Sequence, residues 1–248
     1  MDKTILITGA SRGIGAATAL LAGEKGYNVC VNFMQNEVVA NNIVNQIKEN
    51  GGNAIAYKAD VSVESDVIQL FKKIDTDFGR IDALVNNVGI LEKQSRVEDL
   101  ELQRLQNILN TNIISSFLCC KEAIKRMSTK NGGIGGRIVN VSSIASKTGS
   151  PNEYVDYAAS KAAIDTLTIG LSKEVANENI RVNAVRPGFI YTEIHSDGGE
   201  TNRVDRLKEN IPMKRGGQPI EVAKAILWLL SDESSFSTGT FIDITGGV

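Results

Sequence analysis

The sequence holds a tyrosine and a lysine four residues apart, Tyr157 and Lys161, which together could transfer a proton. On a helix, residues with this spacing lie on one face, so the lysine can stand beside the phenol. Its positive charge favours the ionised phenol. Lowering the phenol pKa from about 10 to about 7 takes about 4 kcal/mol. One unit charge about 4 Å away supplies that much at an effective dielectric constant of about 20. The spacing therefore predicts Tyr157 as a general acid or base, with its pKa lowered by Lys161.

A second tyrosine, Tyr154, has Ala158 four residues further on and gains no such neighbour. We expect Tyr154 to pack or to line a pocket. Hydroxyl groups that could hold a reacting oxygen follow an apolar run in VNVSS, which ends in Ser142 and Ser143. Open α/β sheets place their sites at such strand ends, although serine pairs there are often only turn formers.

A glycine-rich loop, TGASRGIG at Thr8–Gly15, follows the first apolar run and precedes a helical pattern. In this context Gly9 permits a tight turn and Gly13 lets the backbone approach a pyrophosphate. Gly15 allows close packing of helix on sheet, with the anion at the helix N-terminus. The loop predicts a dinucleotide-binding site.

The end of the second predicted strand bears on which dinucleotide binds. It reads Val31-Asn32-Phe33 and has no carboxylate to bind ribose hydroxyls or repel a 2′-phosphate. Arg12, inside the glycine loop, can offer a fork of donors to a phosphate, the alternative being a solvated loop charge. These features favour NADP(H), with NAD(H) as the alternative.

Short apolar runs alternate with helical patterns along the whole chain, which predicts parallel strands joined by helical crossovers. The predicted strands are Thr4–Thr8, Val29–Phe33, Ala54–Ala59, Ala83–Asn86, Arg137–Val141, Arg181–Val185 and Thr240–Ile244. The predicted helices are Gly13–Lys25, Glu37–Glu49, Glu64–Phe78, Asn112–Met127, Tyr157–Ala176 and Ile220–Leu230. We expect one α/β domain over 1–248, a Rossmann-type doubly wound parallel seven-stranded sheet with helices on both faces.

Composition narrows the classes of partner. The formal net charge of −2 and the absence of basic runs argue against nucleic acid or an anionic membrane. No apolar stretch approaches the length of about 20 residues that spans a bilayer, and no secretory leader is expected. The three cysteines have no metal-binding spacing and fit a reducing compartment. We expect a soluble cytoplasmic protein without a metal site.

Taken in order along the chain, these motifs resemble the short-chain dehydrogenase/reductase family. They are TGASRGIG, Asp60-Val61, NNVG at Asn86–Gly89, Asn112, VNVSS, Tyr157-x-x-x-Lys161 and RPGFIYT at Arg186–Thr192. Each is moderately specific alone, and together they cover nearly the whole chain.

The resemblance implies roles for individual residues. Tyr157 would be the general acid/base, and Lys161 would lower its pKa and hold the nicotinamide ribose. Ser143 would bind the substrate oxygen, and Asn112 would anchor a water in a proton relay. The expected cofactor-binding residues are Gly9, Ser11, Arg12, Gly13, Ile14, Gly15, Asn32, Phe33, Asp60, Val61, Asn87, Gly89, Tyr157, Lys161, Pro187, Gly188, Ile190 and Thr192.

Two departures from the family pattern occur. Val88 stands where the family usually has alanine, and its larger side chain could shift the nearby backbone. The separation of Ser143 from Tyr157 is one residue longer than expected, so Ser142 remains an alternative for the substrate-binding role.

The implied reaction is hydride transfer between nicotinamide C4 and a carbonyl or secondary alcohol carbon. The chain resembles bacterial sugar (glucose) dehydrogenases and 3-oxoacyl-carrier-protein reductases, which suggests a sugar or a 3-oxoacyl thioester as substrate. A polar segment, about 189–217, is expected to form a lid over the pocket. Arg203 and Arg206 in it could receive an anion or belong to a solvated helix face, and His195 has no ligand partners in sequence.

Two other functions are open to such a sequence. A non-catalytic NADP(H)-binding sensor or regulator would need no intact Tyr157–Lys161 pair, and a sugar-nucleotide epimerase would be expected to carry a larger C-terminal substrate domain. The family pattern also implies a homotetramer, whereas the alternative is that helices Asn112–Met127 and Tyr157–Ala176 are buried only on their own sheet.

Overall fold

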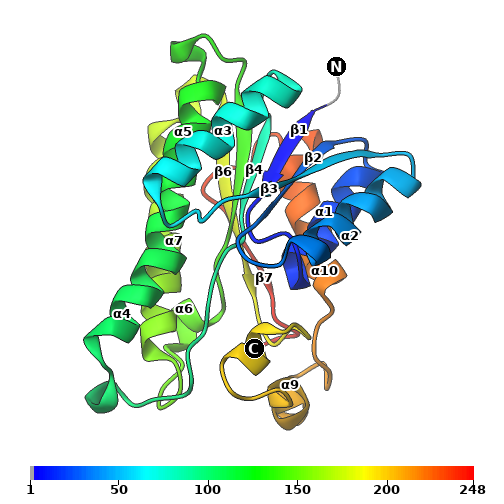
Figure 1. Cartoon of the computed structure of the whole chain (residues 1–248). Coiled ribbons are helices and arrows are strands. Elements are labelled where there is room, and N and C mark those ends of the chain that lie inside the picture. The colour runs from blue at the N-terminus through cyan, green and yellow to red at the C-terminus, as the bar shows by residue number, and fades with distance from the viewer. Residues whose placement is uncertain (1–2) are drawn as a thin grey trace.

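Seven parallel strands form the central sheet of the computed structural model, which describes residues 3–248 (Figure 1). The strand order is β3-β2-β1-β4-β5-β6-β7, so the order reverses between β1 and β4. The strands are β1 (Thr4–Ile7), β2 (Asn28–Phe33), β3 (Asn53–Lys58), β4 (Ala83–Asn86), β5 (Gly136–Val141), β6 (Ile180–Pro187) and β7 (Phe241–Ile244). The expected doubly wound α/β fold is confirmed.

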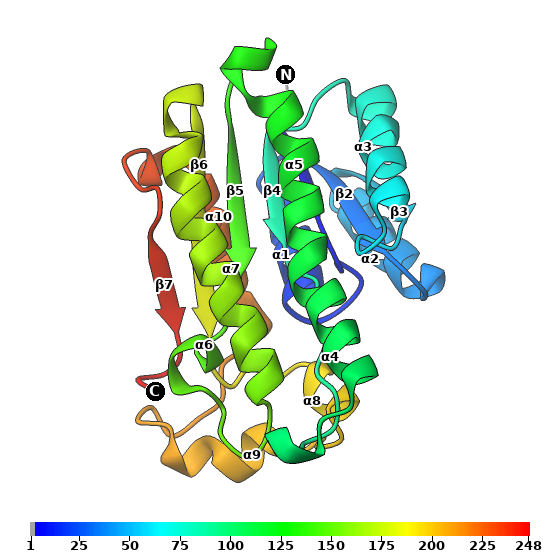
Figure 2. The ribbon, with the colours of Figure 1, turned by 90° about the vertical axis from the view of Figure 1, so that its left-hand side faces the viewer.

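Helices cover both faces of the sheet (Figures 1 and 2). One face carries α1 (Gly13–Glu24), α2 (Glu37–Glu49) and α10 (Pro219–Leu230); the other carries α3 (Glu64–Phe78), α5 (Ser115–Met127) and α7 (Val155–Glu174). Successive strand residues point to opposite faces. Accordingly, Ile5 and Ile7 of β1 belong to the core under α1, whereas Leu6 between them belongs to the core under α3.

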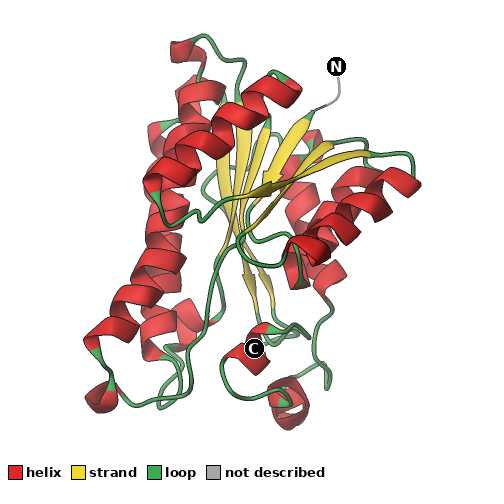
Figure 3. Ribbon diagram, viewed as in Figure 1, coloured by secondary structure: helices red, strands yellow, loops and turns green. Residues whose placement is uncertain are grey.

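The parallel register brings the carboxyl ends of the strands to one edge of the sheet. Leu6 of β1 aligns with Cys30 of β2 on one side and with Leu84 of β4 on the other. The loops that follow β1, β4, β5 and β6 therefore gather beyond this edge, together with short helices (Figure 3). In doubly wound sheets this edge, near the reversal of strand order, is where ligands bind.

The helix expected at Asn112–Met127 is longer than predicted. It begins with α4 (Leu102–Leu109), passes through a π-helical turn, η2 (Asn110–Ile114), and continues as α5. The predicted start was wrong: Leu102, Leu105, Ile108 and Leu109 recur at helical spacing before it, but the segment is short and only Ile108 of it is buried. Single π turns occur frequently at functional sites.

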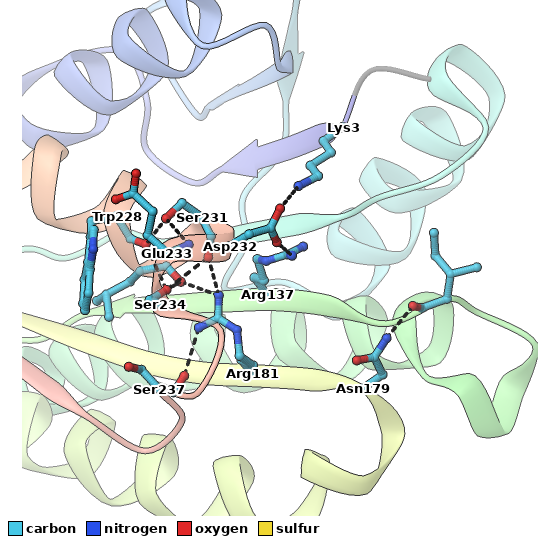
Figure 4. A network of polar contacts seen from close by, with 12 residues as sticks. Lys3, Arg137, Asn179, Arg181, Trp228, Ser231, Asp232, Glu233, Ser234 and Ser237 are labelled. Carbon is cyan, nitrogen blue, oxygen red and sulfur yellow. Dashed lines mark hydrogen bonds and ion pairs between the residues drawn. The ribbon is translucent and has the colours of Figure 1, made fainter.

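A partly buried arginine on β6, Arg181, fixes the segment that follows α10 (Figure 4). Arg181 donates hydrogen bonds to the carbonyl oxygens of Leu229 at 2.9 Å, Ser231 at 3.0 Å and Ser237 at 2.9 Å. These carbonyls include one from the last turn of α10, which has no partner within the helix. Burial lowers the pKa of Arg181, and nearby Arg137 lowers it further.

We expect the substitution Arg181→Met to lower the free energy of unfolding by about 1–3 kcal/mol, because methionine keeps the apolar stem but removes the guanidinium donor from three carbonyls, two of which then have only the shared Ser234 hydroxyl. Urea unfolding followed by circular dichroism measures this loss. Lys3→Met, which removes an exposed ion pair to Asp232 at 3.4 Å, is the control, with an expected change within about 0.5 kcal/mol. Equal losses in the two variants would show that the Arg181 contacts contribute no stability.

Candidate active site

The glycine turn between β1 and α1 has the backbone that the sequence predicts. Gly9 and Gly13 have φ of +60° and +55°, values that side chains other than glycine rarely adopt. A Cβ on Gly15 would stand 2.5 Å from the Gly9 carbonyl oxygen, so this glycine allows α1 to pack closely on the turn. Arg12, the N-cap residue of α1, makes no side-chain cap bond. The first N–H groups of α1 can therefore receive an anion.

Hydrogen bonds join this turn to the end of the neighbouring strand β4. Asn87 Nδ2 donates to the carbonyl oxygens of Thr8 at 2.9 Å and Gly9 at 3.1 Å. In return, Thr8 Oγ1 accepts from the backbone N–H groups of Asn87 at 3.0 Å and Val88 at 3.2 Å. The Val88 side chain packs against Gly9, with Cγ2 only 3.1 Å from where a Cβ on Gly9 would lie. The main chain at Val88 is therefore anchored despite the larger side chain.

Asn32 supports the glycine turn from the end of β2. Its Oδ1 accepts from the Gly9 N–H at 3.2 Å, and its Nδ2 donates to the carbonyl oxygens of Tyr57 at 3.3 Å and Ala59 at 3.1 Å. The side chain is buried, and these bonds use its polar atoms for the protein itself. The residues here that line the cleft include no acid: they are Asn32, Phe33, Met34, Gln35 and Asn36.

Helix α7 places Lys161 beside Tyr157, as the spacing predicts. The Lys161 Nζ lies 5.6 Å from the centre of the Tyr157 ring and donates to the Val141 carbonyl oxygen at 2.9 Å. Opposite it, a Cβ on Gly89 would stand 3.1 Å from Nζ. Lys161 is almost fully buried, so its ammonium is held between the ends of β4 and β5.

The expected lowering of the Tyr157 pKa, which relied on Lys161 together with the positive ring of an oxidised nicotinamide, does not arise from Lys161 alone. Burial raises the pKa of Tyr157 to about 12, although the neighbouring Ser143 hydroxyl acts to lower it. Burial also lowers the pKa of Lys161 to about 8, although the charge of Asp165 acts to raise it. The physical reason is that removal from water penalises both charged forms. At neutral pH Tyr157 therefore keeps its proton and is in the state of a proton donor.

The two serines after β5 point to different partners. Ser142 is buried and donates through Oγ to the Lys161 carbonyl oxygen at 3.1 Å. Ser143 accepts from the Ala145 N–H at 3.1 Å, and its hydroxyl neighbours Tyr157. The geometry thus favours Ser143 over Ser142 as the partner of the Tyr157 hydroxyl.

Asn112 lies in the π turn and is fully buried. Its Oδ1 accepts from the Ile90 N–H at 2.8 Å, and its Nδ2 donates to the Ile90 carbonyl oxygen at 3.1 Å and to Ser160 Oγ at 3.0 Å. The side chain therefore ties the π turn to the loop after β4 and to α7. Its expected role as the anchor of a water molecule stays a prediction.

A cleft of about 1070 Å³ collects these residues at the carboxyl edge of the sheet. Every predicted cofactor-binding residue except Gly15 lines it, as do Ser143, Tyr157 and Lys161; Gly15 and Asn112 lie behind the lining. Sequence reasoning missed further lining residues. They are Gln35, Asn36, Val39, Leu91, Asn107, Asn110, Thr111, Thr148 and Ser150, among others; the segment expected as a lid also lines the cleft, through Phe189, Ile194, His195, Asp197 and Arg203. Most lie in loops or short helices, where no hydrophobic period marks them.

Tyr154 and Arg203 close the far end of the cleft. Tyr154 is buried and donates through its hydroxyl to the Gly198 carbonyl oxygen at 3.2 Å, as expected of a pocket-lining residue. The Arg203 guanidinium lies 4.8 Å from the Tyr154 ring centre and pairs with Glu153 and Glu200. Arg203 is buried, so it does not lie on a solvated helix face, and its two acidic partners offset the charge that an anion would need.

His195 is placed differently from the polar loop expected for it. It lies in α8 (Ile194–Asp197), is largely buried, and has Nε2 3.0 Å from the Ile190 carbonyl oxygen. Burial lowers its pKa, so it is neutral at pH 7. Within residues 3–248, no group of three or more His, Cys, Asp and Glu side chains is arranged to hold a metal ion.

The glycine turn at the switch in strand order, with Tyr157 and Lys161 in the same cleft, defines a dinucleotide-dependent oxidoreductase of the Rossmann type. The chain belongs to the short-chain dehydrogenase/reductase family. Residues 9–248 match a family model described as enoyl-(acyl carrier protein) reductase.

Relatives and solved structures agree with this membership. The chain is 60% identical over 242 residues to the uncharacterized oxidoreductase YgfF of Escherichia coli K12, covering 98% of each protein. It is 36% identical to glucose 1-dehydrogenase 2 of Bacillus subtilis 168, covering 99% of this chain and 94% of the relative. A crystal structure of a short-chain dehydrogenase/reductase from Mycobacterium marinum superposes with a TM-score of 0.92 at 33% identity, covering 98% and 94% of the two chains.

The protein is therefore an oxidoreductase that acts on CH–OH or carbonyl groups of a small molecule, and its family uses a nicotinamide cofactor. The uncapped start of α1 and the Gly9, Gly13 and Gly15 cradle fit such a cofactor. Along residues 3–248, no helix has the length and apolar character needed to cross a bilayer.

Proposed function

We propose that this protein is an NADP(H)-dependent reductase or dehydrogenase in which Tyr157 transfers the proton. The observation that carries the proposal is the position of the Tyr157 side chain, which lies beside Ser143 and Lys161 in the cleft onto which the glycine turn opens. The bound cofactor would supply or accept the hydride.

In the reducing direction, the carbonyl carbon gains the hydride and the C=O electron pair moves onto the oxygen. Tyr157 donates its hydroxyl proton to that oxygen, and Ser143 donates a hydrogen bond that stabilises the developing negative charge. The pKa of Tyr157, about 12 in this environment, keeps the proton available at neutral pH. Lys161, beside the ring, favours the phenolate that remains until a solvent proton replaces the one transferred.

The preference for NADP(H) over NAD(H) is supported by charge. Arg12 lines the cleft, and no carboxylate follows β2 where one would repel a 2′-phosphate.

The names of relatives bear on the substrate. A FabG relative at 35% identity from Staphylococcus epidermidis is named as a 3-oxoacyl-[acyl-carrier-protein] reductase, and a Bacillus relative is named as a glucose dehydrogenase. These names support a 3-oxoacyl thioester or a sugar as candidate substrates.

We further propose a homotetramer, which exposed apolar side chains on neighbouring helices support. Leu109, Ile114 and Phe117 are exposed along α4, η2 and α5, and Ile169 is exposed on α7. Helices α5 and α7 run side by side on one face of the molecule (Figure 2). Pairing of these helices between subunits would bury the four side chains.

We also propose a cytoplasmic location. The three cysteines are unpaired and buried, which supports a reducing compartment.

A turnover screen tests the function. Purified protein is incubated with NADPH or NADH and ketones, including 3-oxoacyl thioesters, and with NADP or NAD and sugars, while absorbance at the reduced nicotinamide band is followed. We expect turnover with at least one pair that contains the phosphorylated cofactor. Binding of NADPH without turnover of any substrate would favour the non-catalytic sensor instead.

A further inference from the structure

An ion pair joins the glycine turn to the segment 189–217, which we call the lid. The Arg12 guanidinium contacts the carboxylate of Asp197, the last residue of α8, although the two residues are 185 positions apart. Both residues line the cleft. Arg12 is the cation that the sequence offers to a cofactor phosphate, so in this structure that cation already has an acidic partner.

The lid also presses on the glycine turn beside this ion pair. The Thr192 side chain lies 3.2 Å from the position that a Cβ on Gly13 would occupy, and a carboxylate oxygen of Glu193 lies 3.6 Å from it. Two lid acids, Glu193 and Asp197, thus stand at the turn that the phosphates of a dinucleotide would approach.

The ion pair between Arg12 and Asp197 is weak enough for a phosphate to displace it. The side chains of Arg12 and Asp197 are 51% and 43% exposed, and exposed pairs of this kind are weak. A ribose 2′-phosphate carries close to two negative charges and three acceptor oxygens, as phosphorylated side chains do, and can bind a guanidinium through two parallel hydrogen bonds. It therefore outcompetes one carboxylate for Arg12.

We propose that Asp197 lowers the preference for NADP(H) by occupying Arg12 until the 2′-phosphate of NADP(H) displaces it. NAD(H), which has no 2′-phosphate, leaves the pair intact. Asp197 thus weakens the binding of the phosphorylated cofactor alone, and its displacement couples cofactor entry to release of α8 from the glycine turn. This inference rests on the proposed preference for NADP(H).

The test is the dissociation constant of each reduced cofactor, measured by titration of nicotinamide fluorescence without substrate. We expect Asp197→Asn to lower the Kd for NADPH about two- to fivefold, because Arg12 loses its competitor. The Kd for NADH should change less than about twofold. Asp205→Asn is the matched control: Asp205 is also a lid carboxylate but pairs with Tyr191 and Lys208, and we expect a change below about twofold for both cofactors.

The same substitution in a protein that lacks Arg12 separates competition for Arg12 from a general effect of removing a negative charge. In an Arg12→Met protein, the gain from Asp197→Asn should vanish, since no guanidinium remains to be released. The inference is overturned if the gain is equal for both cofactors, if Asp205→Asn matches it, or if it persists without Arg12. A wild type that binds neither cofactor refutes the proposed function as well. A wild type that binds and turns over NADPH, with no effect of Asp197→Asn, refutes only this inference.

Discussion

Replacement of Tyr157 by phenylalanine should reduce kcat about 10²- to 10⁴-fold, which is the usual contribution of a positioned general acid. The substitution removes one hydroxyl from a side chain held on α7 beside Ser143 and leaves the cleft otherwise intact. The dissociation constant for the cofactor should stay within about threefold, because the turn that binds the phosphates is untouched. Steady-state kinetics on an active substrate, together with a binding titration, measure both quantities.

Tyr154→Phe is the natural control, since it removes the same hydroxyl three residues earlier. Tyr154 donates to the Gly198 carbonyl at 3.2 Å, and its ring lies under Arg203, whereas Lys161 lies over the ring of Tyr157. We expect kcat to fall less than about tenfold, through small movements of the lid. If Tyr157→Phe retained full activity, or if Tyr154→Phe were the more damaging change, the assignment of the proton to Tyr157 would be wrong.

The second large effect is expected for Lys161→Met, which should lower turnover about a hundredfold and yet stabilise the cofactor-free protein by about 1–2 kcal/mol. Burial lowers the pKa of Lys161 from 10.5 to about 8, so the charged side chain costs stability at neutral pH, at about 1.4 kcal/mol per pKa unit. Methionine has a similar volume and no charge to bury. Part of the gain is offset because the Val141 carbonyl loses its donor, 2.9 Å away.

The pH dependence gives this prediction a definite sign. Between pH 8 and 10.5 the unfolded chain binds a proton at Lys161 that the folded chain has released, so wild-type stability should rise with pH across this window. Below pH 8 the full penalty is present. Denaturant unfolding of Lys161→Met at several pH values should lack this part of the slope, whereas Lys173→Met, on an exposed position of α7, should retain it. An identical slope in both variants would contradict the buried charge.

The fold was predictable because its elements repeat a simple alternation. Each strand is an apolar run short enough to be a strand, and most of the helices between them have an apolar face that the sheet buries. The prediction missed α4, although Leu102, Leu105, Ile108 and Leu109 recur there at helical spacing; the helix is only 8 residues long, and only Ile108 of it is buried. It also missed the short helices α8 and α9 (Arg203–Leu207) of the lid, which are held by pairs such as Arg203 with Glu153 rather than by a hydrophobic period.

The site was predictable where chemistry depends on local spacing. The glycine turn and the Tyr157–Lys161 step each lie on one element, so their geometry follows from the sequence. The pKa of Tyr157 did not, because it depends on how deeply the completed fold buries the phenol. The pairing of Arg12 with Asp197 joins residues 185 positions apart, and no local sequence pattern predicts such a contact.

The helix that passes through the π turn at Asn110–Ile114 makes the substrate end of the cleft sensitive to chain length. Such a turn holds one residue more than a regular α-helical turn and absorbs it locally, so α4 and α5 keep the faces that they turn to the cleft. In the regular helix of α4, by contrast, deleting one residue would rotate the residues before the deletion by about 100° against α5, and Asn107 would leave the cleft wall. The number of residues in α4 therefore sets which side chains face the cleft. Point substitutions here change one lining residue at a time, whereas insertions and deletions replace the whole helix face.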